Sequence, residues 1–145
     1  MQDRFKFRAK RIDNTKFIEG YLCFVYIDNP NKAKIYCPDD CYNYDVYTET
    51  IAQCTGLKDK NGKLIFEGDL LKPLGEDDER VEIIWNEEKA RFGLMIQWTD
   101  PCYWNGLYEE TKTGRDYYDF DEYYAEDFEV IGNIYQDKEL LNDSN

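Results

Sequence analysis

Hydrophobic and polar residues alternate in short runs along this chain, and such alternation is typical of β-strands with one buried face. In residues 5–10 the alternation is strict, with Phe5, Phe7 and Ala9 on one face and cationic side chains on the other. Other short runs are rich in β-branched and aromatic residues, which favour an extended backbone. We expect these further strands at residues 17–27, 33–37, 64–66, 81–85, 92–98 and 128–135.

The segments between these runs predict loops and one short helix. Residues 39–45 are polar and carry tyrosines, which predicts a loop, and residues 46–54 favour an extended conformation over a short helix. Residues 116–127 are almost entirely acidic or aromatic and predict a second, exposed loop. Near the end of the chain, Asp137 is a suitable N-cap for one or two helical turns over residues 137–141.

The stretch of residues 55–71 has the clearest turn chemistry, because glycine recurs in it every six residues. Asn61-Gly62 is the pair best suited to a type I′ hairpin turn, in which both central residues adopt positive φ. Residues 64–66 then form the returning strand, and a second turn leads into Leu70 and Leu71. The residues to which we assign structural turn roles are Gly56, Asn61, Gly62, Gly68 and Asp69.

Together these elements predict a mainly β fold, a β-rich form of the α+β class. We expect an N-terminal β-rich region of strands and a hairpin over residues 1–54. A small SH3-like barrel follows over residues 55–145, with the acidic loop and the short C-terminal helix. The two regions are expected to pack as one compact unit.

Composition supports a folded chain and excludes disorder. The 145 residues are 42% hydrophobic and 17% aromatic, which is enough apolar material for a core despite the high charge. No apolar run approaches the ~18 residues of a membrane span, and the N-terminus lacks the apolar region of a signal peptide. The five cysteines match no extracellular spacing. We therefore expect a cytoplasmic protein that does not bind membranes.

The absence of histidine excludes the chemistry that most often depends on it. The chain has no histidine for a Ser–His or Cys–His nucleophile, or for a zinc site with histidine ligands. Cys37 and Cys41 form only one closely spaced pair, which favours free thiols over a structural zinc site. Glycine spacing around Gly62 fits neither a P-loop nor an EF-hand. We expect no catalytic residues, metal or cofactor, and a metal-dependent enzyme built on carboxylates is the least favoured alternative.

Charge is distributed unevenly along the chain. Residues 1–75 hold 12 basic and 11 acidic side chains, whereas residues 76–145 hold 6 basic and 20 acidic ones, a net charge of -14. Residues 1–16 form a basic edge ahead of this acidic half. The asymmetry is consistent with an internal ion-pair interface or with association between subunits, and the pattern does not choose between them.

The acidic, tyrosine-rich run of residues 116–127 has three interpretations: a solvated loop, a protein-binding patch, or a surface that imitates nucleic acid. Direct binding of nucleic acid is not expected, because phosphates would be repelled. For the protein-binding interpretation, the candidate partner-binding residues are Asp116, Tyr117, Tyr118, Asp119, Asp121, Glu122, Tyr123 and Tyr124.

Three segments resemble the YopX family, whose members are small proteins carried mainly by bacteriophages and prophages. They are Phe5-Lys6-Phe7-Arg8-Ala9, residues 55–69, and residues 126–135, and they occur in the expected order. One departure is Lys10, where an aromatic residue is expected, and this affects only packing at that edge. The resemblance implies a phage context and a β-rich fold that can self-associate. It implies no established activity and transfers no catalytic residues.

The leading hypothesis is therefore a non-enzymatic phage or prophage protein in the host cell cytoplasm. It would act as a protein-interaction module through its acidic, tyrosine-rich surface, with a host or phage protein as the partner. A basic or nucleic-acid-binding partner suits the charge. The alternative is an acidic mimic of nucleic acid that inhibits a host nuclease, defence protein or nucleic-acid-binding protein. Homo-oligomerisation stays open.

Overall fold

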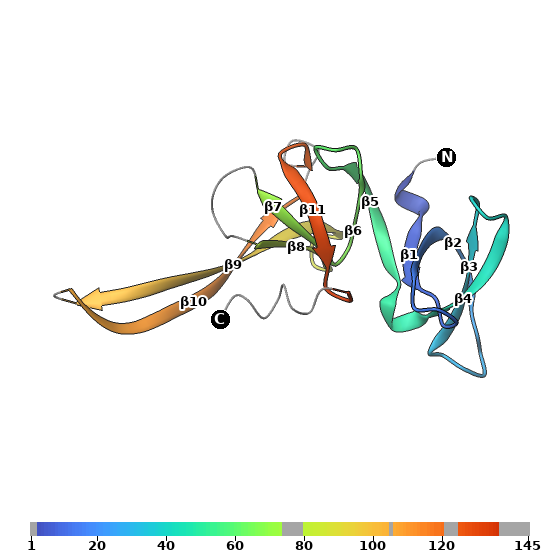
Figure 1. Ribbon diagram of the computed structural model, residues 1–145, viewed down its shortest axis with the longest axis horizontal. Coiled ribbons are helices and arrows are strands. Elements are labelled where there is room, and N and C mark those ends of the chain that lie inside the picture. Colours follow the sequence, from blue (N-terminus) through green and yellow to red (C-terminus); the bar gives the residue numbers. More distant parts are fainter. Residues whose placement is uncertain (1–2, 74–79, 105, 121–124, 137–145) are drawn as a thin grey trace. The chain divides into compact units, whose positions relative to one another are not determined.

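The computed structural model describes residues 3–73, 80–104, 106–120 and 125–136 (Figure 1). It is strand-rich and contains two antiparallel sheets, so the predicted mainly β class is confirmed. The chain divides into two compact units. Unit 1 comprises residues 1–58 and 64–67, and unit 2 comprises residues 59–63 and 68–145. The division therefore crosses the chain several times and does not fall at one point near residue 54.

Unit 1 contains a six-stranded antiparallel sheet with the order β4-β3-β2-β1-β5-β6. Its elements in chain order are η1 (Asp3–Phe5), β1 (Phe7–Lys10), β2 (Phe17–Val25), β3 (Lys32–Cys37), β4 (Tyr42–Tyr47), η2 (Thr48–Thr50), β5 (Ala52–Lys58) and β6 (Leu64–Phe66). The sheet is curled, since an isolated bridge joins Arg11, next to β1, to Val46 of β4, although β2 and β3 lie between these two strands in the sheet order. The Ile12 amide also donates to the Asp45 carbonyl, at 3.0 Å.

The core of unit 1 follows from strand alternation and small side chains. Ala9, Ala33, Ile35 and Val46 form one fully buried cluster on β1, β3 and β4. A second cluster on β5 and β6 consists of Ala52, Cys54 and Phe66. Full burial of a side chain of the size of Ile35 or Val46 contributes about 1.5–3 kcal/mol. In β1, Ala9 lies on the face that the alternation predicted to be buried, but Arg8 on the opposite face is also only 7% exposed.

Gly20 in β2 is required by a close approach between backbones that the sequence does not reveal. A Cβ atom at this position would overlap the carbonyl oxygen of Tyr36 in β3. β2 also carries an irregularity between Leu22 and Phe24, where the register with β3 shifts. Only a residue without a side chain fits where the two strands come together.

Unit 2 contains a five-stranded antiparallel sheet with the order β10-β9-β8-β7-β11. Its strands are β7 (Asp69–Pro73), β8 (Arg80–Asn86), β9 (Arg91–Trp104), β10 (Leu107–Asp119) and β11 (Phe128–Asn133). The buried hydrophobic residues described in this unit are Leu70, Leu71, Val81, Ile83, Leu94, Phe120, Ala125 and Phe128. The apolar runs that begin at residues 70 and 81 supply four of them, namely Leu70, Leu71, Val81 and Ile83.

The β9–β10 hairpin is longer than the rest of this sheet. β8 pairs with β9 only over residues 91–97, whereas β9 and β10 pair with each other along nearly their whole length. Residues 98–104 of β9 therefore pair with β10 alone, and the hairpin extends past the other strands of unit 2 (Figure 1, yellow and orange).

The expected SH3-like barrel over residues 55–145 is wrong. β6 was expected to join the later strands, but it pairs with β5 in the sheet of unit 1. The Glu67 amide donates to the Gln53 carbonyl at 2.9 Å, and the Thr55 hydroxyl donates to the Ile65 carbonyl at 2.8 Å. These bonds hold β6 on its local partner, and the strand pairings among the described residues form open sheets. The expected helix at 137–141 lies outside the described residues.

Three local expectations also differ from the structure. Residues 42–45 belong to β4 and residues 116–119 to β10, although both were predicted as loops. Phe5 lies in the short helix η1 and is exposed, so the first strand begins only at Phe7. Polar composition suggested loops, but in both strands the backbone groups pair with an antiparallel neighbour, and this pairing outweighs local preference.

The turn at residues 59–63 has a different type from the one that Asn61-Gly62 predicts. Gly62 adopts a positive φ of 80°, but Asn61 does not, so the turn is not type I′. The Gly62 amide donates to the Asp59 carbonyl at 3.0 Å, and the Asp59 amide donates to the Lys63 carbonyl at 2.8 Å. This pattern is that of a type I turn followed by a glycine in the left-handed region.

The Asp59 carboxylate selects this turn. Its Oδ1 accepts hydrogen bonds from the amides of Asn61 and Lys63, both at 2.9 Å, and its Oδ2 accepts one from the Val130 amide of β11 at 3.0 Å. Burial by itself would raise the pKa of Asp59, but the three amide donors outweigh burial and lower the pKa below its usual value. The carboxylate is therefore charged and buried, and both of its oxygens accept hydrogen bonds.

Gly68 and Asp69 form the next junction in unit 2. The Gly68 amide donates to the Ile83 carbonyl at 2.7 Å, and its carbonyl accepts from the Ile134 amide at 2.9 Å. Gly56, Gly62 and Gly68 all have positive φ, at 83°, 80° and 81°. Asp69 is fully buried at the start of β7, opposite Asn133 in the register with β11. Gly68 is thus bonded both to the middle of β8 and to the residue that follows β11.

We predict that Asp59→Ala lowers the free energy of unfolding by about 2–4 kcal/mol, because three amides lose a charged acceptor. Urea denaturation followed by circular dichroism measures the change. Asp28→Ala, at an exposed position, is the matched control and is expected to change stability by less than about 0.5 kcal/mol. Equal effects of the two substitutions would contradict the role of Asp59.

The same carboxylate predicts a loss of stability in acid. Since the pKa of Asp59 is lowered by folding, its contribution is fully present above the unfolded-state value of about 3.9. The contribution is lost as pH falls through the lower pKa of the folded state. Urea midpoints measured from neutral pH to below pH ~4 are therefore expected to fall less steeply for Asp59→Ala than for the unchanged chain. Parallel curves would contradict this.

Gly20 and Gly62 provide a comparison between crowding and backbone strain. We predict that Gly20→Ala destabilises by about 2–3 kcal/mol, because the new methyl group overlaps backbone of β3. Gly62→Ala is expected to cost only about 1 kcal/mol, because its Cβ meets open space and the cost is the positive φ alone. Thermal unfolding of the two variants tests the order, and the reverse order would exclude the close approach at Gly20.

Candidate functional site

The negative charge of the protein belongs to one of its two compact units. Unit 1 has nine basic and nine acidic residues, whereas unit 2 has nine basic and 22 acidic residues. The whole formal net charge of -13 is therefore carried by unit 2. This division is sharper than the one between the two halves of the sequence. The excess of acidic side chains therefore belongs to unit 2.

Part of the predicted partner-binding patch lies at the end of β10, and we call Asp116, Tyr117, Tyr118 and Asp119 the β10 surface. Tyr117 is 59% exposed and Tyr118 is 53% exposed. Successive strand residues point to opposite faces, so the two rings lie on different sides of the sheet. The other four predicted residues, Asp121, Glu122, Tyr123 and Tyr124, lie outside the described residues. The structure thus brings together half of the predicted patch.

The two carboxylates of the β10 surface are not equivalent. Asp119 forms ion pairs with Lys89 at 3.4 Å and with Arg91 at 3.5 Å, across the turn that joins β8 to β9. Asp116 is exposed and has no ion pair within the part of the chain that the structure describes. Much of the charge of Asp119 is therefore balanced inside unit 2, and Asp116 is the carboxylate available to a partner.

An aromatic pair lies on the same face as Tyr118. Trp85 of β8 stands opposite Phe92 of β9, with ring centroids 5.0 Å apart and edge-to-face geometry. Tyr118 is in register with Leu94, two residues along β9 from Phe92, and therefore shares their face. Trp85 is 40% exposed, although Ile83 beside it is fully buried. Sequence reasoning did not assign Trp85 to this surface, because its apolar run also predicts core.

Glu82 lies on the opposite face, in a row with Met95 and Tyr117. The register places Glu82 opposite Met95, and Met95 opposite Tyr117. Burial raises the pKa of Glu82, while the nearby Arg115 guanidinium opposes the increase. Sequence reasoning missed Glu82, since one acid among 31 has no distinguishing local signal. The β10 surface therefore has a half-buried carboxyl group behind Tyr117 on this face.

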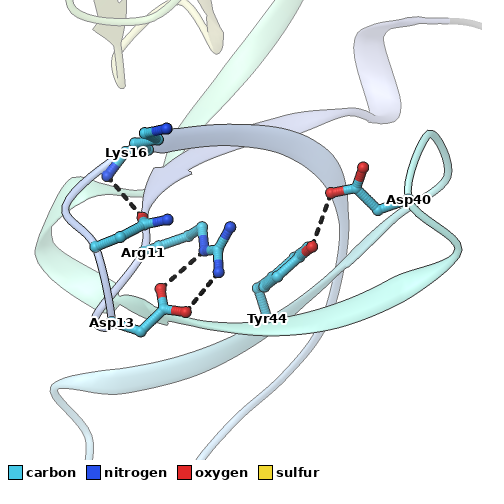
Figure 2. A network of polar contacts seen from close by, with 6 residues as sticks. Arg11, Asp13, Lys16, Asp40 and Tyr44 are labelled. Carbon is cyan, nitrogen blue, oxygen red and sulfur yellow. Dashed lines mark hydrogen bonds and ion pairs between the residues drawn. The ribbon is translucent and has the colours of Figure 1, made fainter.

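Unit 1 has a separate polar network, shown in Figure 2, between the β1–β2 turn and β4. The Arg11 guanidinium donates to both carboxylate oxygens of Asp13, with Nε at 2.8 Å from Oδ1, and lies 3.9 Å from the centre of the Tyr44 ring. The Tyr44 hydroxyl donates to Asp40 at 2.8 Å, and the Lys16 amide donates to Oδ1 of Asn14 at 3.0 Å (Figure 2). Each member already has a partner.

The pKa directions agree with a structural role for this network. The hydrogen bond from Arg11 lowers the pKa of Asp13, and the hydrogen bond to Asp40 raises the pKa of Tyr44. Both changes stabilise the protonation states found at neutral pH. An acid or base that transfers protons at neutral pH would instead have its pKa shifted toward neutrality. The network therefore ties the turn to β4 and does not resemble an acid-base pair.

Asp45 organises a second polar cluster in unit 1. It accepts a hydrogen bond from the Tyr26 hydroxyl at 2.8 Å and pairs with Lys32 at 3.2 Å and with Lys34 at 3.4 Å. Lys32 also lies 4.7 Å from the centre of the Tyr26 ring. The two cations are thus balanced by one carboxylate and one ring, which leaves little net charge for a partner of unit 1.

The thiols of unit 1 differ in exposure. Cys37 and Cys54 are buried, whereas Cys23 and Cys41 are exposed, and all four are free. Burial raises the pKa of Cys54, which keeps that thiol protonated. Among the described residues, no group of three or more Cys, Asp or Glu side chains is placed to hold a metal ion. Cys37 and Cys41 are therefore at the end of β3 and in the following turn without further ligands nearby.

In the described ranges, no helix is long and apolar enough to cross a membrane.

Comparison with models of protein families gives a match over nearly the whole chain. The family model described as YopX protein matches residues 6–142, which is nearly the whole chain and includes the turn built on Asp59. No curated protein matches the sequence at a significant level. The resemblance seen in residues 5–9, 55–69 and 126–135 is confirmed by this match, and the chain belongs to the YopX family.

Proposed function

We propose that this protein is a non-enzymatic protein-binding module of a bacteriophage or prophage. It acts in the host cytoplasm, and the β10 surface of unit 2 contacts a basic region of a host or phage protein. The observation that supports this most strongly is the coincidence of two features in one unit. Unit 2 has the whole net charge, and its β10 strand has two tyrosines that are more than half exposed.

Tyrosine and carboxylate side chains contribute differently to such binding. A tyrosine offers a large contact area with few rotatable bonds, so fixing it in an interface costs little entropy. The negative charge of unit 2 attracts a cationic partner over several ångströms and increases the rate of encounter. Tyr117 and Tyr118 then supply short-range contact, and Asp116 supplies a carboxylate without an internal ion pair among the described residues.

The same charge argues against nucleic acid as the direct ligand. A protein that binds nucleic acid needs a basic footprint to neutralise phosphates. In unit 2 the acidic residues outnumber the basic residues by 22 to nine. In unit 1, Lys32 and Lys34 are already paired with Asp45. A basic protein surface is the partner that suits the charge of unit 2.

We predict that combined Tyr117→Ala and Tyr118→Ala substitution, and separately Asp116→Lys, reduces partner capture by at least about tenfold. The tagged full-length chain is incubated with lysate from phage-bearing cells, and bound proteins are quantified by mass spectrometry. Loss of contact area weakens capture in the first variant, and like-charge repulsion weakens it in the second.

Matched controls lie in unit 1. Tyr42→Ala removes a tyrosine that is 62% exposed, and Asp28→Lys reverses an exposed acid. Both controls are expected to keep capture, and circular dichroism verifies that every variant is folded. Equal capture by the β10 variants and the unchanged chain would contradict the proposal. Release of the partner by duplex DNA would favour the nucleic-acid mimic instead.

A further inference from the structure

β10 is the terminal strand of the unit 2 sheet, and its register shows which backbone groups face outward. The Phe120 amide donates to the Phe92 carbonyl at 3.2 Å, so the backbone N–H and C=O groups of Phe120 point toward β9. In an antiparallel ladder, residues alternate between those that bond to the neighbour and those that bond away from it. The N–H and C=O groups of Thr113, Arg115 and Tyr117 therefore point away from β9, and those of Asp116 and Tyr118 point toward it.

This outer edge has no strand partner within the described ranges, because β10 ends the sheet order. β10 spans 13 residues, so its outward groups form a long row of donors and acceptors. An edge of this kind is a template for an added strand. The part beyond β8 is only two strands wide, and a two-stranded ribbon is marginally stable in water. Thr113 lies in this two-stranded part, whereas Arg115 and Tyr117 are opposite residues of β9 that β8 also pairs.

We propose that the outer edge of β10 binds an extended, basic peptide segment of a partner protein as an additional β-strand. This inference depends on the proposed function, because it assumes that unit 2 is the partner-binding unit. Main-chain hydrogen bonds to Thr113, Arg115 and Tyr117 provide the alignment of the added strand. Side chains of the β10 surface provide the selectivity for charge.

The arrangement of the β10 surface specifies the added strand further. Side chains of a strand alternate between faces, so the added strand places its residues beside Tyr117 on one face and beside Asp116 and Tyr118 on the other. A cationic residue next to Asp116 forms an opposite-charge cross-strand pair. Tyr118 can cover the stem of a Lys or Arg side chain on the face of Asp116, whereas the exposed Arg115 disfavours a cation on the face of Tyr117. The favoured ligand thus has basic residues at alternate positions.

A second copy of β10 is a poor occupant of the same edge. Pairing two such strands brings together two units that each have 22 acidic and nine basic residues. Acidic residues directly opposite each other in a sheet are destabilising. Charge therefore favours a basic segment from another protein over self-pairing at this edge.

Backbone hydrogen exchange measured by NMR tests the inference on the unchanged full-length chain. The probe is a short blocked peptide of alternating lysine and valine, and the matched control peptide replaces lysine with glutamate. Without peptide, we expect fast exchange at the Arg115 and Tyr117 amides and slow exchange at Asp116 and Tyr118. The basic peptide is expected to slow Arg115 and Tyr117 by at least about tenfold, and the acidic peptide is expected to have no effect.

A proline variant tests the same edge independently. Thr113→Pro removes an outward N–H group while it leaves the inward ladder intact, and Thr113→Val keeps the N–H group. The first variant is expected to weaken binding of the basic peptide at least about fivefold, and the second to leave it unchanged. Unchanged binding in the Thr113→Pro variant would overturn strand addition, as would unchanged exchange at Arg115 and Tyr117 on addition of the basic peptide.

The two proposals can fail separately. In one case, the substitutions at Tyr117, Tyr118 and Asp116 reduce partner capture, but Thr113→Pro does not weaken binding of the basic peptide. Unit 2 then binds through side chains, and the strand-addition inference is wrong. If the three side chains are not needed for capture, the proposed function itself fails. Light scattering that shows a dimer lost in Thr113→Pro would assign the edge to a second copy and overturn the basic-segment inference.

Discussion

The local structure of this protein depends most clearly on one buried carboxylate. Asp59 accepts hydrogen bonds from the amides of Asn61, Lys63 and Val130, which closes a turn and anchors the beginning of β11. The Lys60 amide adds a bond to the Phe128 carbonyl at 3.0 Å. A charged group can remain buried there because three backbone donors replace the water that it loses. The turn and the final strand are therefore parts of one hydrogen-bonded unit.

The sheet of unit 2 combines this ordered centre with an exposed edge. β7 lies between β8 and β11 and contains fully buried residues such as Leu71, whereas β10 lies at the end of the sheet and has exposed tyrosines. Charged residues on an edge strand discourage uncontrolled pairing between copies of a protein. Under the proposed strand addition, the same charges would select a basic partner.

Several elements could be predicted because their signals are local. Alternation marked β1, and the apolar run at 81–85 marked β8. The turn type at Asn61 could not be predicted from the Asn-Gly pair, because the Asp59 side chain selects the turn through bonds that include a distant strand. Residues 116–119 could not be recognised as a strand, because their pairing with residues 93–96 outweighs their polar composition. The partner-binding role of the tyrosine-rich run was predicted from composition and stays a prediction.

By itself, the sequence determined the β class, the positions of most strands, the turn glycines and the family, since all of these depend on local patterns of side chains. Tertiary structure decided which strands pair, so that β6 joined the first sheet and β10 became an edge. It also decided why Gly20 must be a glycine and why Asp119 is internally balanced whereas Asp116 is exposed. These outcomes depend on contacts between residues far apart in the chain, and local patterns do not encode such contacts.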